Sequence, residues 1–185
     1  MTKLKFLTGN KHKFYEGSKV CSEFGIELEQ AVADIDEIQH HDPIKITIQK
    51  VKSAYDALQC PVVVSDHSWE IPALGGFPGG YMKDMNGWLK SEDFLLLMKD
   101  KQDKRVFLHE VVAYYDGDTL KTFEHTRPGH FLDEPHGVSG PSFARVVEIE
   151  GDGMSISEVF GKGNWETKEE HQKAWYDFAK WFKNK

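Results

Sequence analysis

The chain has 185 residues, a formal net charge of −7, 39% hydrophobic residues and 29% charged residues. These values are typical of a soluble globular protein, and we expect residues 1–185 to form one domain. The negative charge disfavours a nucleic-acid polymer as partner, because no excess of cations is available to neutralise many phosphates. The two cysteines have no framework spacing, and no signal peptide or membrane-spanning run is evident. We therefore expect a cytoplasmic protein without a membrane partner.

Strands and helices alternate in the first part of the sequence. Asp42 and Pro43 are typical of the cap and the first turn of a helix, and apolar side chains then recur on one face. Gly25 is expected to end the first predicted helix, because glycine is common just beyond the C-terminus of a helix. The predicted elements of this part are strands over residues 3–8, 26–30 and 60–66 and helices over residues 11–24 and 43–58.

Strand signals dominate the later part of the sequence. Ser91 reads as a helix cap with acidic residues behind it, and two strand-like runs flank Asp116-Gly117, which is a strong hairpin signal. Further strands are expected over residues 129–135 and 143–151, and a helix over residues 168–182 with His171, Trp175, Phe178 and Phe182 on one stripe. The whole pattern predicts a mixed α/β sheet.

The stretch Thr8-Gly9-Asn10 lies between the first predicted strand and the first predicted helix. Ligands of α/β sheets bind beyond the carboxyl ends of strands, and free N–H groups at a helix start suit an anion. Lys11 and Lys13 are cations in a first helical turn, where they oppose the helix dipole, so a bound anion would explain them. A surface turn with solvated lysines is the alternative for so short a motif.

Carboxylates gather in two further segments. Asp66 ends an apolar run, and Glu37 lies in the acidic loop over residues 34–42. Crowded carboxylates repel one another unless a cation joins them, and a hard metal ion bound through oxygen is one candidate. The alternatives are a turn aspartate and a solvated acidic loop. The sequence has no P-loop, and His40-His41 lacks the second Cys/His pair that a zinc site requires.

Four stretches, in this order, resemble the family of noncanonical purine nucleoside triphosphate pyrophosphatases, the inosine triphosphate pyrophosphatases. They are FLTGNKHKFYE, DIDEIQ, VVVSDHSWEIPALGGFPGGYMK and FEHTRPGHFLDEPHG, within residues 4–137. The resemblance implies an elongated, two-lobed α/β fold with a central cleft, a magnesium requirement and a homodimer. It implies hydrolysis of inosine or xanthosine triphosphate to the monophosphate and pyrophosphate.

The resemblance also implies roles for individual residues. Glu37 and Asp66 would serve the Mg²⁺ ion and the attacking water, and Lys13 would act with them on the triphosphate. The implied substrate-binding residues are Thr8, Asn10, Lys13, Lys83, Phe143 and His171. Phe143 matches the aromatic residue that stacks on the base, and His171 the histidine that reads it.

The chain departs from the family at several of these positions. Ser65 replaces an acidic residue before Asp66, Ala144 replaces an aspartate, and Gln172 replaces an arginine. Hydrogen-bond readout discriminates among bases, so we expect an altered base preference, with His67, Ser68 and His171 as candidate substitutes. The alternative function is a nucleotide-binding protein that has lost turnover.

Overall fold

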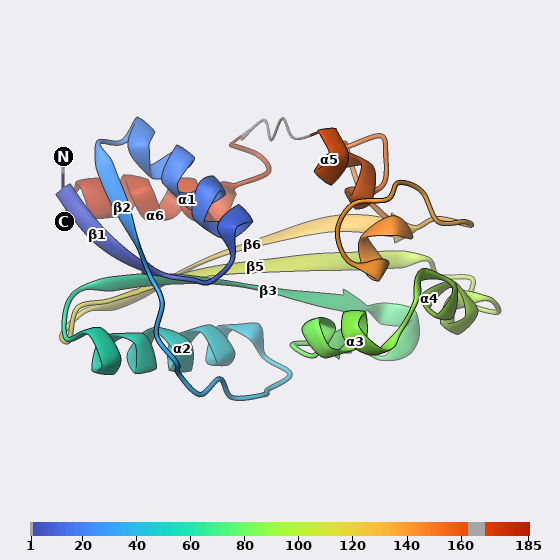
Figure 1. The fold of residues 1–185 in the computed structure, drawn as a ribbon, viewed down its shortest axis with the longest axis horizontal. Coiled ribbons are helices and arrows are strands. Elements are labelled where there is room, and N and C mark those ends of the chain that lie inside the picture. The colour runs from blue at the N-terminus through green and yellow to red at the C-terminus, as the bar shows by residue number, and fades with distance from the viewer. Residues whose placement is uncertain (1, 163–168) are drawn as a thin grey trace. The chain divides into compact units, whose positions relative to one another are not determined.

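The computed structural model of the chain describes residues 2–162 and 169–185 (Figure 1). Its strands are β1 (Thr2–Leu7), β2 (Ile26–Ala31), β3 (Val62–Ile71), β4 (Phe77–Gly79), β5 (Arg105–Tyr115), β6 (Leu120–Phe131) and β7 (Val147–Ile149). Its α-helices are α1 (Lys11–Glu23), α2 (Pro43–Leu58), α3 (Met82–Trp88), α4 (Ser91–Met98), α5 (Ile156–Lys162) and α6 (Lys173–Lys183). Short 3₁₀ turns occupy Pro72–Leu74 and Ser142–Arg145. No helix of these described residues is long and apolar enough to cross a membrane.

One mixed sheet of seven strands runs through the described residues. The strand order is β2-β1-β3-β5-β6-β7, and β4 pairs with β3. β1 is parallel to both β2 and β3, whereas the pairs β3–β4 and β6–β7 are antiparallel. The predicted mixed α/β sheet is thereby confirmed.

The chain divides into two compact units. Unit 1 comprises Met1–His67, Glu110–His125 and Thr167–Lys185, and unit 2 comprises Ser68–His109 and Thr126–Glu166. The strands β3, β5 and β6 contribute residues to both units. The expectation of a single domain over residues 1–185 stays a prediction.

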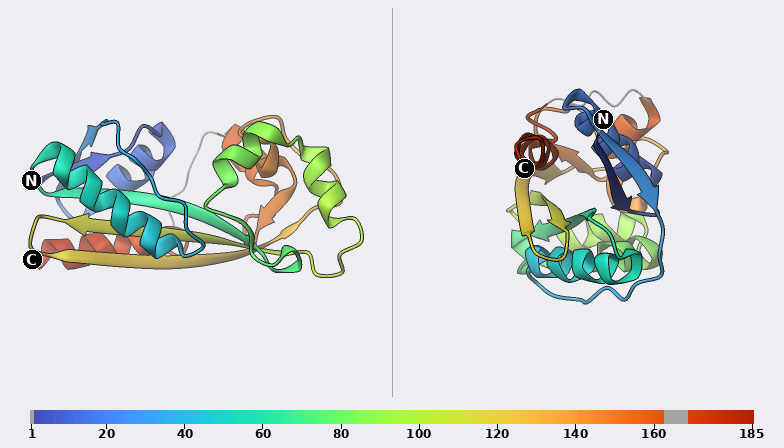
Figure 2. Two further views of the ribbon diagram at one scale, coloured as in Figure 1. Left: turned by 90° about the horizontal axis from the view of Figure 1, so that it is seen from below. Right: turned by 90° about the vertical axis from the view of Figure 1, so that its left-hand side faces the viewer.

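The sheet of unit 1 has helices on both faces. Alternation along the strands sends Phe6 and Val63 toward α1 and α6, and Val62 and Val64 toward α2. Figures 1 and 2 show α2 on one side of these strands, with α1 and α6 on the other. Trp175 of α6 is 1% exposed, and its ring meets the Phe6 ring edge-on at 5.0 Å between centroids.

Unit 2 has a core of its own, formed by β3, β5, β6, β7, α3 and α4. Its buried side chains include Ile71, Phe94, Val106, Phe131 and Phe143. The rings of Phe94 and Phe131 pack edge-on against Phe143, with centroids 5.1 and 5.6 Å away.

Several elements begin or end where the sequence predicts. The Asp42 side chain accepts a hydrogen bond from the Ile44 N–H, and Pro43 is the first residue of α2. Gly25 follows the end of α1 with a φ of +77°, a conformation that favours glycine. Asp116 Oδ1 accepts from the N–H groups of Asp118 and Thr119 in the turn between β5 and β6.

Several boundaries differ from the prediction. Gly129–Phe131 is the end of β6 and not the start of a separate strand over residues 129–135, and of residues 143–151 only Val147–Ile149 forms a strand. β3 does not end at Asp66 but continues to Ile71, so Asp66 lies within the strand. Lys90, not Ser91, caps α4, and the buried Ser91 hydroxyl instead donates to the Ser142 carbonyl. α6 begins at Lys173, so His171 precedes the helix and is not part of its apolar stripe. Lys168, the first residue of the predicted helix, lies outside the described residues.

Gly17 is where α1 comes closest to α6. A Cβ atom on Gly17 would lie 2.7 Å from the ring of the buried Trp175. Gly17→Ala should therefore lower the free energy of unfolding by about 1–3 kcal/mol through overpacking, a loss larger than the roughly 1 kcal/mol that alanine gains in helix propensity. Urea unfolding measures the change.

Gly87→Ala on α3 is the matched control, because a Cβ atom there would meet nothing within 4 Å. This variant should be neutral or slightly more stable than the parent. Equal effects of the two substitutions would contradict the close packing of α1 on Trp175.

The two cysteines differ in their access to solvent. Cys21 is fully buried on α1, and burial raises the pKa of its thiol to about 12, whereas Cys60 is partly exposed. Thiolates are the reactive form, so one thiol per native chain should react with a disulfide reagent near neutral pH, and both should react in denaturant. Rapid reaction of both thiols in the native protein would show that the α1 packing is wrong.

Candidate functional site

The turn between β1 and α1 is stabilised by its own side chains. Asn10 Oδ1 accepts hydrogen bonds from the N–H groups of His12 and Lys13, at 2.9 and 3.3 Å, and so caps α1. Thr8 Oγ1 accepts from the Asn10 N–H at 3.1 Å. Two of the N–H groups that an anion was expected to use are thus already bonded. The observed contacts of Thr8 and Asn10 shape the turn, and their contact with phosphate stays a prediction.

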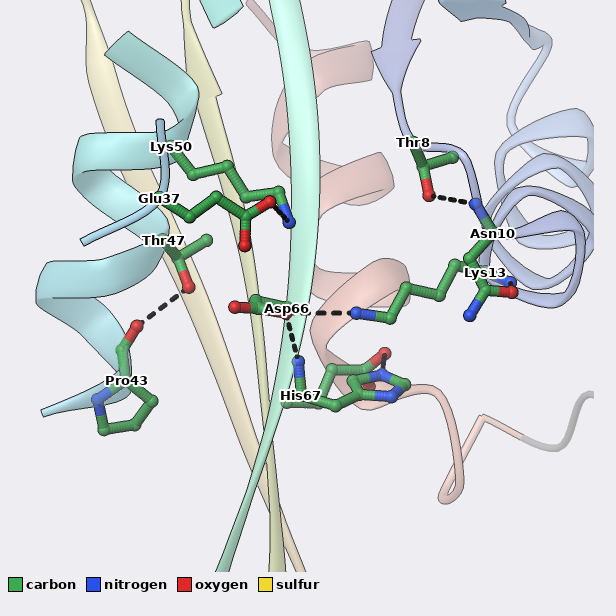
Figure 3. A network of polar contacts seen from close by, with 10 residues as sticks. Thr8, Asn10, Lys13, Glu37, Pro43, Thr47, Lys50, Asp66 and His67 are labelled. Atoms are coloured by element: carbon green, nitrogen blue, oxygen red, sulfur yellow. Dashed lines mark hydrogen bonds and ion pairs between the residues drawn. The ribbon is translucent and has the colours of Figure 1, made fainter. Parts of the chain in front are cut away.

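Lys13 and Asp66 form the centre of the site. Lys13 Nζ lies 3.1 Å from Asp66 Oδ1, and the two side chains are only 17% and 24% exposed. The same carboxylate oxygen accepts from the backbone N–H of His67 at 3.0 Å. Figure 3 shows Lys13 extending from α1 toward Asp66 on β3. Two residues that are 53 positions apart in the sequence therefore meet, as expected if both serve one ligand.

Glu37 meets a lysine that the sequence analysis did not single out. Lys50 of α2 lies 2.8 Å from Glu37 Oε1, and its side chain is 12% exposed. Figure 3 shows this pair close to Asp66. The sequence pattern could have indicated Lys50, because it lies one helical turn after Ile46 and Thr47, which are both buried, and so on the same face of α2. A lysine on the buried side of an amphipathic helix needs an anion nearby.

The electrostatics of Asp66 follow from its neighbours. Burial raises the pKa of its carboxyl, but Lys13 and Lys50 lower it, so that the pKa lies below the usual value for aspartate. Asp66 is therefore ionised near neutral pH. It is available as a hydrogen-bond acceptor or as a metal ligand.

The carboxylates of this site fit a magnesium ion that arrives with a substrate. Mg²⁺ is usually held by one or two carboxylates together with water and substrate phosphates. Glu37 and Asp66 provide such a pair. No group of three or more His, Cys, Asp or Glu side chains suited to a metal ion occurs in residues 2–162 and 169–185. A magnesium ion bound by these two carboxylates would therefore take its remaining ligands from water and substrate.

Two predicted substrate contacts belong to unit 2. Lys83 is an exposed residue of α3. Phe143 is 2% exposed, and its ring packs against Trp69, Phe94 and Phe131. The observed contacts of Phe143 are thus with the core of unit 2, and its stacking on a base stays a prediction.

His171 occupies the turn before α6. Its Nε2 atom lies 3.7 Å from Glu170 Oε1, and its side chain is 22% exposed. Gln172, the next residue, is only 9% exposed. A role for His171 in reading the base stays a prediction.

Comparison with known proteins places this chain in a family. Residues 4–172 match the model of the Ham1 family. A dITP/XTP pyrophosphatase from Methanopyrus kandleri is 29% identical over 184 residues, covering 98% of this chain and 97% of the relative. An inosine triphosphate pyrophosphatase 2 from Trypanosoma cruzi is 30% identical over 159 residues, covering 85% of this chain and 81% of the relative.

A solved structure agrees with the fold. The HAM1 protein from Coxiella burnetii has a TM-score of 0.82 with 17% sequence identity, and each chain is covered completely. At this identity the likeness concerns the fold alone. The match of the family model to almost the whole sequence carries the assignment: the chain belongs to the Ham1 family.

Proposed function

We propose that this protein is a magnesium-dependent nucleoside triphosphate pyrophosphatase that releases the monophosphate and pyrophosphate. One observation carries the proposal: the partly buried pair Lys13–Asp66 lies close to the pair Lys50–Glu37, and Lys50 acts electrostatically on Asp66 (Figure 3). Two cations and two acidic oxygen donors are the groups that a metal-bound triphosphate requires. The names of the relatives make noncanonical purines, such as inosine and xanthosine triphosphate, the first substrates to test.

The lysines and Asp66 have different roles in the proposed reaction. Lys13 and Lys50 exchange their carboxylate partners for phosphate oxygens and neutralise the charge of the triphosphate. Asp66, which is ionised in its pair with Lys13, orients a water molecule toward the α-phosphorus or accepts its proton once Lys13 has turned to the phosphates. Pyrophosphate leaves with the electrons of the broken bond, and the monophosphate retains the new oxygen.

A magnesium ion would be held by Glu37 and Asp66, and when bound it would polarise the phosphate oxygens and neutralise the leaving pyrophosphate. We further propose that the protein is a homodimer, as the resemblance to the family implies, and that it is cytoplasmic, in keeping with its two cysteines without framework spacing. Sedimentation at micromolar concentration tests the dimer.

The decisive experiment is a pyrophosphate-release assay over inosine, xanthosine, guanosine, adenosine and pyrimidine triphosphates. We expect release with magnesium and a loss of at least about 100-fold when the metal is chelated. A protein that binds nucleotides with micromolar affinity but releases no pyrophosphate from any of them would contradict the proposal.

A further inference from the structure

The side chain of Asn86 on α3 makes a contact that the site described above does not use. Its oxygen Oδ1 accepts a hydrogen bond from the backbone N–H of Phe143 at 3.0 Å, and the Ser142 hydroxyl lies 3.3 Å from the same oxygen. The bond joins two segments that are 57 positions apart in the sequence, both within unit 2. Because a backbone N–H can only donate, the amide oxygen of Asn86, and not its nitrogen, must face Phe143.

The partner of Asn86 is held firmly in unit 2. The Phe143 ring is 2% exposed and packs edge-on against the rings of Trp69, Phe94 and Phe131. A buried ring with three such contacts can shift little, because protein interiors are close-packed. The backbone of Phe143 is therefore a fixed reference point to which α3 is fastened.

The helix α3 is too short to be fixed by its own backbone. It has seven residues and no side-chain cap at its N-terminus. Isolated helices of this length are not stable in water, so the position of α3 depends on tertiary contacts. Within α3, Met82 and Met85 pack against the core of unit 2. Methionine is flexible and apolar contacts have no direction, so these two side chains leave the rotation of α3 about its axis loosely defined.

The hydrogen bond from Phe143 supplies the missing direction. An N–H···O bond requires a narrow range of distance and angle, so Asn86 fixes which side of α3 faces the Ser142–Arg145 turn. Lys83 precedes Asn86 by three residues and therefore lies on a neighbouring side of the helix. Its side chain is exposed, so nothing comparable holds it from outside α3. A rotation of α3 would carry the Lys83 ammonium group away from its present place.

We propose that Asn86 is a positioning residue that holds Lys83 in the place from which it binds phosphate, by fixing α3 to the backbone of Phe143. Asn86 itself does not touch the substrate and acts only through Lys83. The inference rests on the proposed function and on the predicted contact of Lys83 with phosphate. Misplacement of a binding group by about 1 Å already has large effects on an enzyme. The expected result of losing Asn86 is weaker substrate binding with the chemical step preserved.

Asn86→Leu tests the inference, because leucine has a similar size but cannot accept the Phe143 N–H. We expect the KM of the triphosphate to rise about five-fold or more, while kcat stays within about two-fold of the parent value. In a Lys83→Ala background the same substitution should have no further effect on KM, because the residue through which it acts is gone. An unchanged KM in folded Asn86→Leu protein, or an equal rise in both backgrounds, would overturn the inference while leaving the pyrophosphatase intact.

Ser91→Ala is the matched control, because the Ser91 hydroxyl donates to the Ser142 carbonyl at 2.9 Å and so fastens α4 to the same turn. No residue of α4 is assigned to the substrate, so this variant should lose stability but keep the parent KM. A rise of KM equal to that of Asn86→Leu would contradict a specific role of Asn86, because any loosening of the turn would then suffice.

Asn86→Gln carries the test if Asn86→Leu does not fold. The longer amide keeps an acceptor for the Phe143 N–H but displaces α3 from the turn. This variant should raise KM when Lys83 is present and leave KM unchanged in the Lys83→Ala background. Equal effects in the two backgrounds would again overturn the inference.

If no triphosphate is hydrolysed, the proposed function has failed, but the inference is still tested. Calorimetric titration with inorganic tripolyphosphate and magnesium then measures the affinity for phosphate without turnover. Weaker binding by Asn86→Leu when Lys83 is present, with no further loss in the Lys83→Ala background, supports the positioning role. The same loss in both backgrounds, or no loss in either, overturns it.

Discussion

Asp66→Asn should lower kcat/KM for pyrophosphate release by about 100-fold or more, because it removes a preorganised charge from the site of reaction. The amide has the size of the carboxylate, so the packing around β3 is retained. It cannot take a proton from water, and it is a weaker partner for a hard cation. The lowered pKa of Asp66 means that the lost group is charged at the pH of the assay.

The control for Asp66→Asn is the same substitution on the surface. Asp56 is exposed on α2, and Asp56→Asn should leave the kinetics unchanged. Circular dichroism and the urea midpoint check that both variants fold. An Asp66→Asn enzyme within a few-fold of the parent rate would remove this carboxylate from the reaction.

Lys13→Ala should have an effect of similar size, with at least about 100-fold lost from kcat/KM, since one charge that neutralises the triphosphate is gone. The same change leaves the partly buried Asp66 without its ion-pair partner, which repels a polyanion further. We therefore expect the Michaelis constant to rise as well as the turnover number to fall. Steady-state kinetics at saturating magnesium measure the Michaelis constant and the turnover number separately.

An exposed lysine supplies the comparison for Lys13→Ala. Lys52 lies on the solvent side of α2, and Lys52→Ala removes the same formal charge from the molecule. If the two variants lost activity equally, the effect would come from net charge and not from the position of Lys13. Full activity of Lys13→Ala on every nucleotide would contradict its assignment to phosphate binding.

The sequence predicts local structure well at helix caps and tight turns, where one or two residues determine the backbone. Asp42 and Pro43 start α2, and Asp116-Gly117 turns the hairpin, because caps and tight turns depend on few neighbours. It fails where polar residues interrupt a buried strand. Ser65 to Ser68 look like the end of β3, yet the strand continues, since flanking strands pair with it and Asp66 and His67 find partners in α1 and β5.

In the candidate site, too, some contacts follow from local motifs and others depend on how the chain packs. The association of Lys13 with Asp66 agrees with the motifs, whereas Lys50 emerges only when α2 is packed against the sheet. The burial of Phe143 depends on rings from three distant segments, which no local pattern reveals. Likewise, Gln172 is a single departure in the sequence, and only the fold brings it to Glu16.

The central claim is that water attacks the α-phosphorus of a nucleoside triphosphate at the Lys13–Asp66 site. One turnover in water labelled with oxygen-18, followed by mass spectrometry of the products, tests it most directly. Attack at the α-phosphorus places the label in the nucleoside monophosphate and leaves the pyrophosphate unlabelled. Label in the pyrophosphate, or release of single phosphates, would contradict the claim.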